Sequence, residues 1–166
     1  MSETLKRLEE TSHLLNELIK SNYNRSKFRT KLNSFISSAR TITLVMQKEY
    51  KHISGFKEWY ESKQIEMKGN ELFKFFKKQR NIIQKEGSIR INVKASTKAV
   101  TDDKGKVIIP IGREKNGRIA TLHKKWKVTN SFKDRPKEDA IDLCKKYFKE
   151  LNELVSECNN KFSLTH

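Results

Sequence analysis

Lysine and arginine side chains between residues 91 and 137 are the groups in this sequence whose type and spacing point most directly to chemistry. This segment contains 13 Lys and Arg against 4 Asp and Glu, so it carries +9 of the formal net charge of +16 on the 166-residue chain. Residues 138–166, in contrast, sum to −2. So uneven a distribution indicates a polyanionic partner, because clustered cations neutralise phosphate groups.

The candidate binding side chains lie on predicted strands and turns, where a nucleic acid could lie across them. Trp126 stands among lysines, and an aromatic ring in that setting suits base stacking beside phosphate contacts, at about 1–3 kcal/mol per base. Two alternatives stay open: the lysines form a merely solvated face, and Trp126 anchors the sheet to the helices. The predicted nucleic-acid-binding residues are Arg90, Lys94, Lys106, Arg113, Lys115, Arg118, Lys124, Lys125, Trp126 and Lys127.

Other kinds of site find little support in the sequence. The four histidines are scattered and no CxxC or HxxxH spacing occurs, so we expect neither a metal nor a cofactor. Cys144 and Cys158 are 14 residues apart on one predicted helix, which separates them by about 21 Å and excludes a disulfide between them. We expect both to be buried thiols.

The composition fits a single domain of residues 1–166, with 34% charged and 35% apolar residues. This apolar fraction is low and is compatible with an oligomer that shares a core. No apolar run approaches the roughly 18–20 residues of a membrane span. The start MSETLKRLEE has no hydrophobic signal-peptide region, so we expect a cytoplasmic protein.

Helical periodicity dominates the first half of the chain and its end. Apolar residues at alternating spacings of three and four predict helices over 3–21 and 25–51, then a third main helix that Gly87 ends. A short aromatic segment precedes that third helix; its rings and the Phe73–Phe76 cluster are better explained by core packing than by base stacking. The last helix starts near Asp134 or Pro136 and carries apolar residues from Ile141 to Phe162.

The pattern changes to strict alternation at residues 88–94, which predicts a half-buried strand with Arg90, Asn92 and Lys94 facing outward. Further strands are predicted at 107–111 and 119–128, the latter after the hairpin signal Asn116-Gly117. The predicted division is therefore residues 1–87 as bundle helices, 88–133 as a basic β-rich insert and 134–166 as the closing helix. The fold class is therefore mainly α (α+β), with a small antiparallel β-sheet inserted before the last helix.

The stretches LNSFISSARTITLVMQKEY, GFKEWYESKQ and FFKKQRNIIQKEG, together with the closing DAIDLCKKYFKELNELV, resemble bacterial proteins of the HEPN-like class. The resemblance implies an up-and-down four-helix bundle, commonly dimeric, whose active members are metal-independent RNases. On this basis we expect a homodimer that forms through the bundle. Their motif is an Arg, a polar residue and, a few residues later, a His. Arg80-Asn81 matches the first half, but Lys85-Glu86-Gly87 stands where the His is expected.

The missing His weakens the case for catalysis, because a pKa near 6.5 lets His exchange protons at neutral pH and Lys or Glu do so only with a large pKa shift. Arg80, Asn81 and Lys85 are the remaining catalytic candidates; a solvated Arg near a helix end is as good an interpretation of Arg80. We therefore expect a nucleic-acid-binding protein, with RNA favoured over DNA. Two alternatives remain: a metal-independent endoribonuclease with a non-standard site around Arg80, and an accessory subunit of a phage-defence or toxin–antitoxin system that meets an acidic protein.

Overall fold

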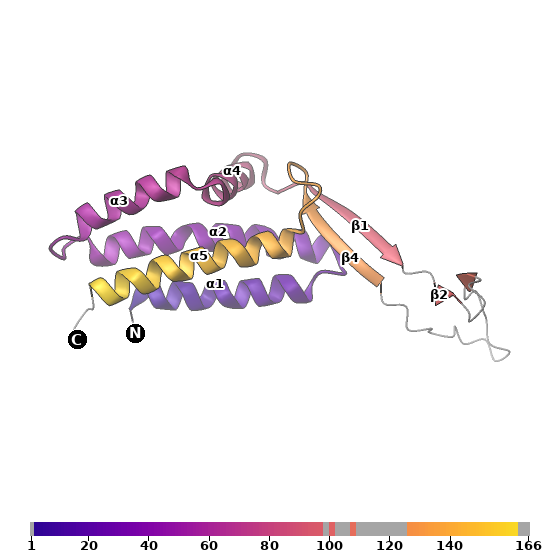
Figure 1. The fold of residues 1–166 in the computed structure, drawn as a ribbon, viewed down its shortest axis with the longest axis horizontal. Helices are drawn as coiled ribbons and strands as arrows, with labels where there is room; N and C mark the ends of the chain where they lie inside the picture. The colour runs from indigo at the N-terminus through magenta and orange to yellow at the C-terminus, as the bar shows by residue number, and fades with distance from the viewer. Residues whose placement is uncertain (1, 98–99, 102–106, 109–125, 163–166) are drawn as a thin grey trace.

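Five helices and two antiparallel strand pairs make up the described part of the chain (Figure 1). The structure is a computed structural model, and it describes residues 2–97, 100–101, 107–108 and 126–162. The helices are α1 (Glu3–Lys20), α2 (Arg25–Tyr50), α3 (Phe56–Gly69), α4 (Glu71–Glu86) and α5 (Ala140–Lys161), and the strands are β1 (Ile91–Thr97), β2 (Val100–Thr101), β3 (Val107–Ile108) and β4 (Trp126–Phe132).

The long helices α1, α2 and α5 form one layer, in which α1 runs antiparallel to the other two (Figure 1). Helices α3 and α4 cover one side of this layer, and α4 crosses it, so that Figure 1 shows α4 almost end-on. The predicted mainly helical fold with a small antiparallel sheet before the last helix is confirmed. The aromatic segment expected to be short is a 14-residue helix, α3, which makes a fifth helix.

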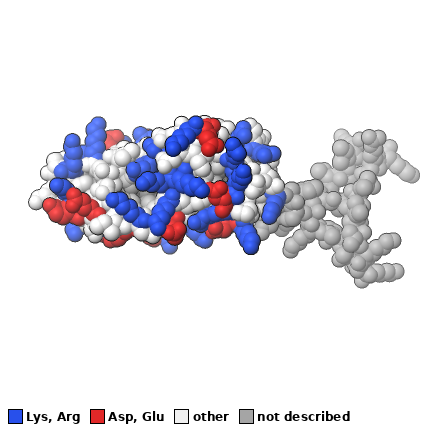
Figure 2. Space-filling model, turned by 90° about the horizontal axis from the view of Figure 1, so that it is seen from above, with Lys and Arg blue, Asp and Glu red and all other residues white. Residues whose placement is uncertain are grey.

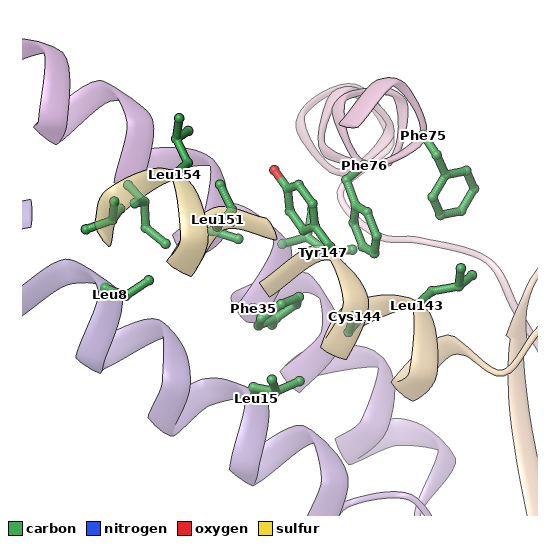
Figure 3. Packing of buried hydrophobic residues seen from close by; sticks show 14 of the residues in the cluster. Leu8, Leu15, Phe35, Phe75, Phe76, Leu143, Cys144, Tyr147, Leu151 and Leu154 are labelled. Atoms are coloured by element: carbon green, nitrogen blue, oxygen red, sulfur yellow. The ribbon is translucent and has the colours of Figure 1, made fainter. Parts of the chain in front are cut away.

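The core runs through the layer of α1, α2 and α5 and continues between that layer and helices α3 and α4, and it follows the predicted apolar stripes. Figure 3 shows Leu8 and Leu15 of α1 pointing toward Phe35 of α2 and toward the buried face of α5. Tyr147 of α5 stacks on Phe76 of α4, with ring centroids 4.2 Å apart and planes 7° from parallel. The aromatic clusters are therefore core packing, as predicted, with Phe73 at its margin. Cys144 and Cys158 are buried and free, which confirms that expectation as well.

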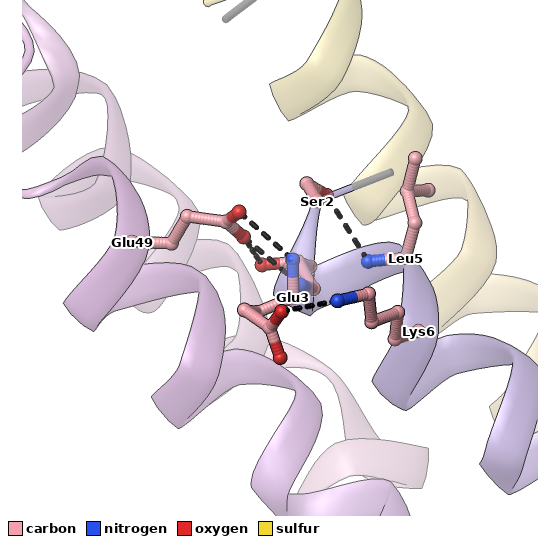
Figure 4. Close-up of polar contacts among 6 residues, drawn as sticks. Ser2, Glu3, Leu5, Lys6 and Glu49 are labelled. Carbon is pink, nitrogen blue, oxygen red and sulfur yellow. Dashed lines mark hydrogen bonds and ion pairs between the residues drawn. The ribbon is translucent and has the colours of Figure 1, made fainter.

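A carboxylate on α2 holds the first turn of α1 in place (Figure 4). The Oε1 atom of Glu49 accepts a hydrogen bond from the backbone N–H of Glu3, and its Oε2 accepts from the N–H and Oγ1 of Thr4, at 2.9, 2.9 and 2.5 Å. Ser2 caps the same turn by accepting from Leu5 N–H at 3.2 Å. These bonds satisfy N–H groups that a helix start otherwise leaves without partners, and they place a negative charge at the positive end of the helix dipole.

β1 and β4 pair antiparallel, with Ile91 opposite Phe132 and Thr97 opposite Trp126. Phe132 is fully buried and meets Phe75 and Phe76 of α4 edge to face, at centroid distances of 4.9 and 6.0 Å. This contact attaches the β1–β4 pair, here called the ribbon, to the end of the bundle, from which it extends outward (Figure 1).

Because the ribbon extends away from the helices, the apolar face that the alternating pattern of β1 predicts is buried only at its start. Arg90, Asn92 and Lys94 are exposed as predicted, but Val93 is 40% exposed although it belongs to the apolar set of the pattern. Burial stops after Ile91 because the next residues of β1 have left the helices behind. The strand predicted at 119–128 falls mostly outside the described residues, and β4 extends beyond it to Phe132. The division of the chain at residues 87 and 133 stays a prediction.

Candidate nucleic-acid interface

Helix α4 carries the best-defined candidate surface, and local sequence signals determine where it begins and ends. At its start, the Oδ1 of Asn70 accepts hydrogen bonds from the N–H groups of Leu72 and Phe73, at 2.8 and 3.2 Å. At its end, Gly87 adopts the left-handed conformation with φ 78°, and its N–H donates to the carbonyl of Ile83 at 2.9 Å. Glycine is the residue that takes this C-terminal conformation without a steric cost from a β-carbon, so α4 ends there as predicted.

The outer face of α4 carries a row of cations. Phe75, Phe76 and Gln79 are buried on the inner face, and helical geometry places the residues at 74, 77, 78, 81 and 85 on the opposite side. We call Lys74, Lys77, Lys78 and Lys85 the lysine row. With Asn81, Ile82 and Glu86 they line a surface hollow of about 450 Å³. Figure 2 views the face that α3 and α4 cover and shows Lys and Arg side chains spread across it with fewer carboxylates between them.

Two members of the lysine row have carboxylate partners. Lys74 lies 2.7 Å from Glu71, and Lys78 lies 2.6 Å from Asp134. The hydrogen bond from Lys78 lowers the pKa of Asp134. Within the described residues, Lys77 and Lys85 have no carboxylate partner, so their charges are the ones most available to an anionic ligand.

The predicted catalytic candidates lie on this same helix. Arg80 is half-buried, and its Nη1 donates to the Oδ1 of neighbouring Asn81 at 3.3 Å. Asn81 and Lys85 line the hollow of the lysine row. The two histidines that the structure describes are elsewhere, His13 on α1 and His52 in the turn after α2. In the described part of the chain, then, no histidine lies beside Arg80.

The predicted binding residues of the insert are described only in part. Arg90 is exposed, with its Nη2 3.7 Å from the Oε2 of Glu86, and Lys94 is exposed on β1. The backbones of Trp126 and Lys127 lie in β4, opposite Thr97 and Ser96. The predicted roles of Lys106, Arg113, Lys115, Arg118, Lys124 and Lys125 concern residues outside the described ranges.

Lys74, Lys77 and Lys78 are not among the binding residues predicted from the sequence, because that prediction was based on the larger excess of positive charge in residues 91–137. Their signal was nevertheless present: cations at spacings of three, four and seven, opposite an apolar stripe of phenylalanines, mark one exposed helix face. Among the described residues, no group of His, Cys, Asp and Glu is arranged to hold a metal ion. None of the helices described is both long and apolar enough to cross a membrane.

Comparison with known proteins gives one consistent result. The family model described as bacteriophage lambda protein ea47 matches residues 1–106. The chain is 34% identical over 97 residues to Protein ea47 of Escherichia phage lambda, an alignment that covers 58% of this chain and 24% of that protein. The chain thus spans about a quarter of the length of this relative. No solved structure matches.

These matches show that the HEPN-like resemblance is wrong, because the three stretches between Leu32 and Gly87 that suggested it lie within residues 1–106, which match a different family. Amphipathic helices rich in Phe, Leu and Lys recur in unrelated helical proteins, and Arg-Asn is too short to identify one of them. The catalytic roles suggested for Arg80, Asn81 and Lys85 depended on that resemblance and lose their basis with it. The lysine row depends only on the structure.

Proposed function

The chain belongs to the family of bacteriophage lambda protein ea47, and from that premise we propose that it binds nucleic acid without cutting it, through the lysine row of α4 and the ribbon. The name of the phage relative states no activity. The proposal therefore depends on the charged surface. It assigns the protein to the cytoplasm, where it would meet its ligand.

The lysine row is the observation that carries the proposal. It extends over a 12-residue stretch of one helix, from Lys74 to Lys85, whose ends are about 16 Å apart at 1.5 Å per residue. At about 3.4 Å per nucleotide along one strand, this length matches roughly five phosphates. Beyond the end of α4 the chain leads directly to Arg90 and Lys94, both exposed, which lengthens the positive track toward the ribbon.

Binding without cleavage is favoured by the surroundings of the row. Lysine ammonium groups attract phosphates, but at neutral pH they are poor proton acceptors. In the described residues, Glu86 is the one carboxylate that lines the hollow, and it lies next to Arg90. These residues favour binding of the phosphate backbone of a nucleic acid over activation of a ribose hydroxyl for cleavage.

We favour RNA over DNA because unpaired strands suit this surface better than a regular duplex. A row on one helix face, near a strand in which Trp126 stands among lysines, can follow a flexible backbone and leave bases free to stack. Sequence readout in a major groove usually relies on Arg pairing with guanine, whereas this surface is mainly Lys. The expected homodimer stays a prediction.

The same cations also suit an acidic protein, the second candidate partner. Lys77 and Lys85, which lack carboxylate partners among the described residues, would pair with Asp or Glu of such a protein. An accessory role of this kind predicts binding to acidic polypeptides and none to RNA.

The test measures fluorescence anisotropy of a labelled 20-nucleotide RNA, and of DNA of the same sequence, with the full chain at 50 and 200 mM NaCl. If the lysine row makes four contacts to a single strand, affinity should fall about 50-fold between these salt concentrations, from a slope of about −0.7 per contact. Tighter binding to RNA than to DNA supports the full proposal. If neither RNA nor DNA binds at 50 mM NaCl, the proposal is refuted. If the chain binds poly-glutamate but neither nucleic acid, the partner is an acidic protein.

A further inference from the structure

A second cavity lies where α2, α3, α4 and α5 meet, next to the lysine row but separate from its hollow. Its volume is about 340 Å³, which is within the range of sites for small ligands. Lys74 and Lys77 of α4 line both spaces. The rest of its lining comes from the other three helices, so this cavity is formed by tertiary packing and not by one helix face.

Rigid aromatic side chains form part of the cavity wall. Tyr147 is held by stacking on Phe76 (Figure 3). It also makes an edge contact with Phe73, at a centroid distance of 5.2 Å. Tyr60 is held by stacking on Phe56 at 5.5 Å, and its hydroxyl accepts a hydrogen bond from Gln47 Nε2 at 2.8 Å. Burial raises the pKa of Tyr147 to about 12. Its hydroxyl is therefore protonated at neutral pH and available as a donor.

Arg40 supplies a cation from α2. It is half-buried, and its Nη1 donates to Thr43 Oγ1 at 2.6 Å. Within the described residues no carboxylate pairs with this guanidinium. Such a group retains several free N–H donors in a planar fork, the geometry that recognises phosphate.

The charge of the lining is one-sided. Arg40, Lys68, Lys74 and Lys77 line the cavity, and no carboxylate does. A hollow of about 560 Å³ between α3 and α5 is different, because four glutamates line it and its Lys63 already bonds Glu66 and Glu157, at 3.0 and 2.9 Å. In the smaller cavity Lys74 is paired with Glu71, but among the described residues Arg40, Lys68 and Lys77 have no carboxylate partner. The smaller cavity is therefore the better anion site.

We propose that this cavity binds a nucleoside phosphate, with the phosphate on Arg40 and the rim lysines and the base against the wall of Tyr60, Phe73 and Tyr147. A free nucleotide and the phosphorylated end of a strand share this chemistry. The inference goes beyond strand binding by the lysine row, because it concerns a separate cavity lined by four helices and a discrete ligand. It does not depend on that function.

Isothermal titration calorimetry of the full chain with AMP, adenosine and inorganic phosphate tests the inference. AMP should bind at least about tenfold more tightly than either fragment, because each fragment forfeits one half of the contacts. Equal affinity for AMP and phosphate overturns the assignment, as does absence of AMP binding. A competition between AMP and RNA with a 5′-phosphate or a 5′-hydroxyl identifies the source: displacement only by the phosphorylated end indicates a strand terminus, and displacement by neither indicates a free nucleotide.

Arg40→Gln should weaken AMP binding at least about tenfold, because it removes charge-assisted hydrogen bonds to phosphate. Arg29→Gln is the matched control, since it makes the same change at an exposed position of the same helix, and it should leave AMP affinity unchanged. If Arg40→Gln fails to fold by circular dichroism, Lys68→Gln decides instead: Lys68 is exposed, and its loss should weaken AMP binding about threefold. Unchanged affinity in the folded variants refutes the site.

The test of the cavity and the test of RNA binding by the lysine row can give different results. Arg40 is not part of the lysine row, so Arg40→Gln should leave binding of a 5′-hydroxyl RNA unchanged. AMP binding without RNA binding would refute the proposed function and keep the cavity. RNA binding without AMP binding would do the reverse.

Discussion

Replacing Lys77 and Lys85 together with glutamine should weaken RNA binding while leaving the fold intact. Both side chains lie on the outer face of α4, and among the described residues neither has a carboxylate partner. Gln is about as good a helix former as Lys and leaves the stem of the side chain in place. The double variant therefore removes two charges from the surface and little else.

The expected magnitude follows from counterion release. Each phosphate contact to a single strand contributes about −0.7 to the slope of log K against log salt, so two lost contacts make the slope shallower by about 1.4. At 1 M salt these contacts contribute least, so the variant and the unchanged protein should bind RNA about equally there. One decade lower, at 0.1 M salt, a slope difference of about 1.4 makes the variant bind about 25-fold more weakly than the unchanged protein. Lys74 and Lys78 are already close to Glu71 and Asp134, so their replacement should have a smaller effect.

Fluorescence anisotropy with labelled RNA between 50 and 400 mM NaCl measures both quantities. The control is Lys48→Gln with Lys57→Gln, which removes the same charge from exposed positions near the end of the bundle opposite the ribbon (Figure 1). It should change the slope by less than about 0.3 through the overall charge alone. Equal effects of the two double variants would refute the lysine row as the binding surface and leave only non-specific attraction by net charge.

The remaining predictions concern stability, measured by chemical denaturation. Phe132→Ala should lower the free energy of unfolding by about 3–5 kcal/mol because it empties the contact between ribbon and bundle, whereas Val93→Ala, at a residue 40% exposed, should change it by less than about 0.5 kcal/mol. Glu49→Ala should cost about 1–3 kcal/mol, since it removes the acceptor of three hydrogen bonds at the start of α1; an unchanged midpoint would contradict that role. Burial raises the pKa values of Cys158 and Tyr147 to about 12, so the unfolded chain releases these protons first as pH rises. Stability should then fall from about pH 9 toward pH 12, by up to about 1.4 kcal/mol per pH unit for each group, and a flat profile over this range would refute their burial.

Much of the helical architecture could be predicted from local patterns. The stripes of α1, α2 and α5 and the glycine after α4 lie where periodicity and capping place them, because these signals act within a few residues of the chain. The length of α3 was missed because its buried aromatic residues, Phe56, Trp59 and Tyr60, lie in its first turns. Its remaining turns are largely polar and show no stripe.

The exposure of Val93 could not be predicted, because alternation says only that two faces differ and not that a helix lies against one of them. The family was also beyond local reasoning. Motifs as short as Arg80-Asn81 recur by chance, and a full alignment was needed to replace the resemblance they suggested.

The sequence by itself determined the helices, their apolar faces and the excess of positive charge, since each depends on residue type and on neighbours along the chain. Only the tertiary structure decided which charges are available to a ligand. Lys78 is close to Asp134, 56 residues away, while Lys77 beside it has no such partner in the described residues. Packing of four helices also brings Arg40 next to Tyr60 and Tyr147 around one cavity. Distances between residues far apart in sequence are set by the fold, and no local pattern encodes them.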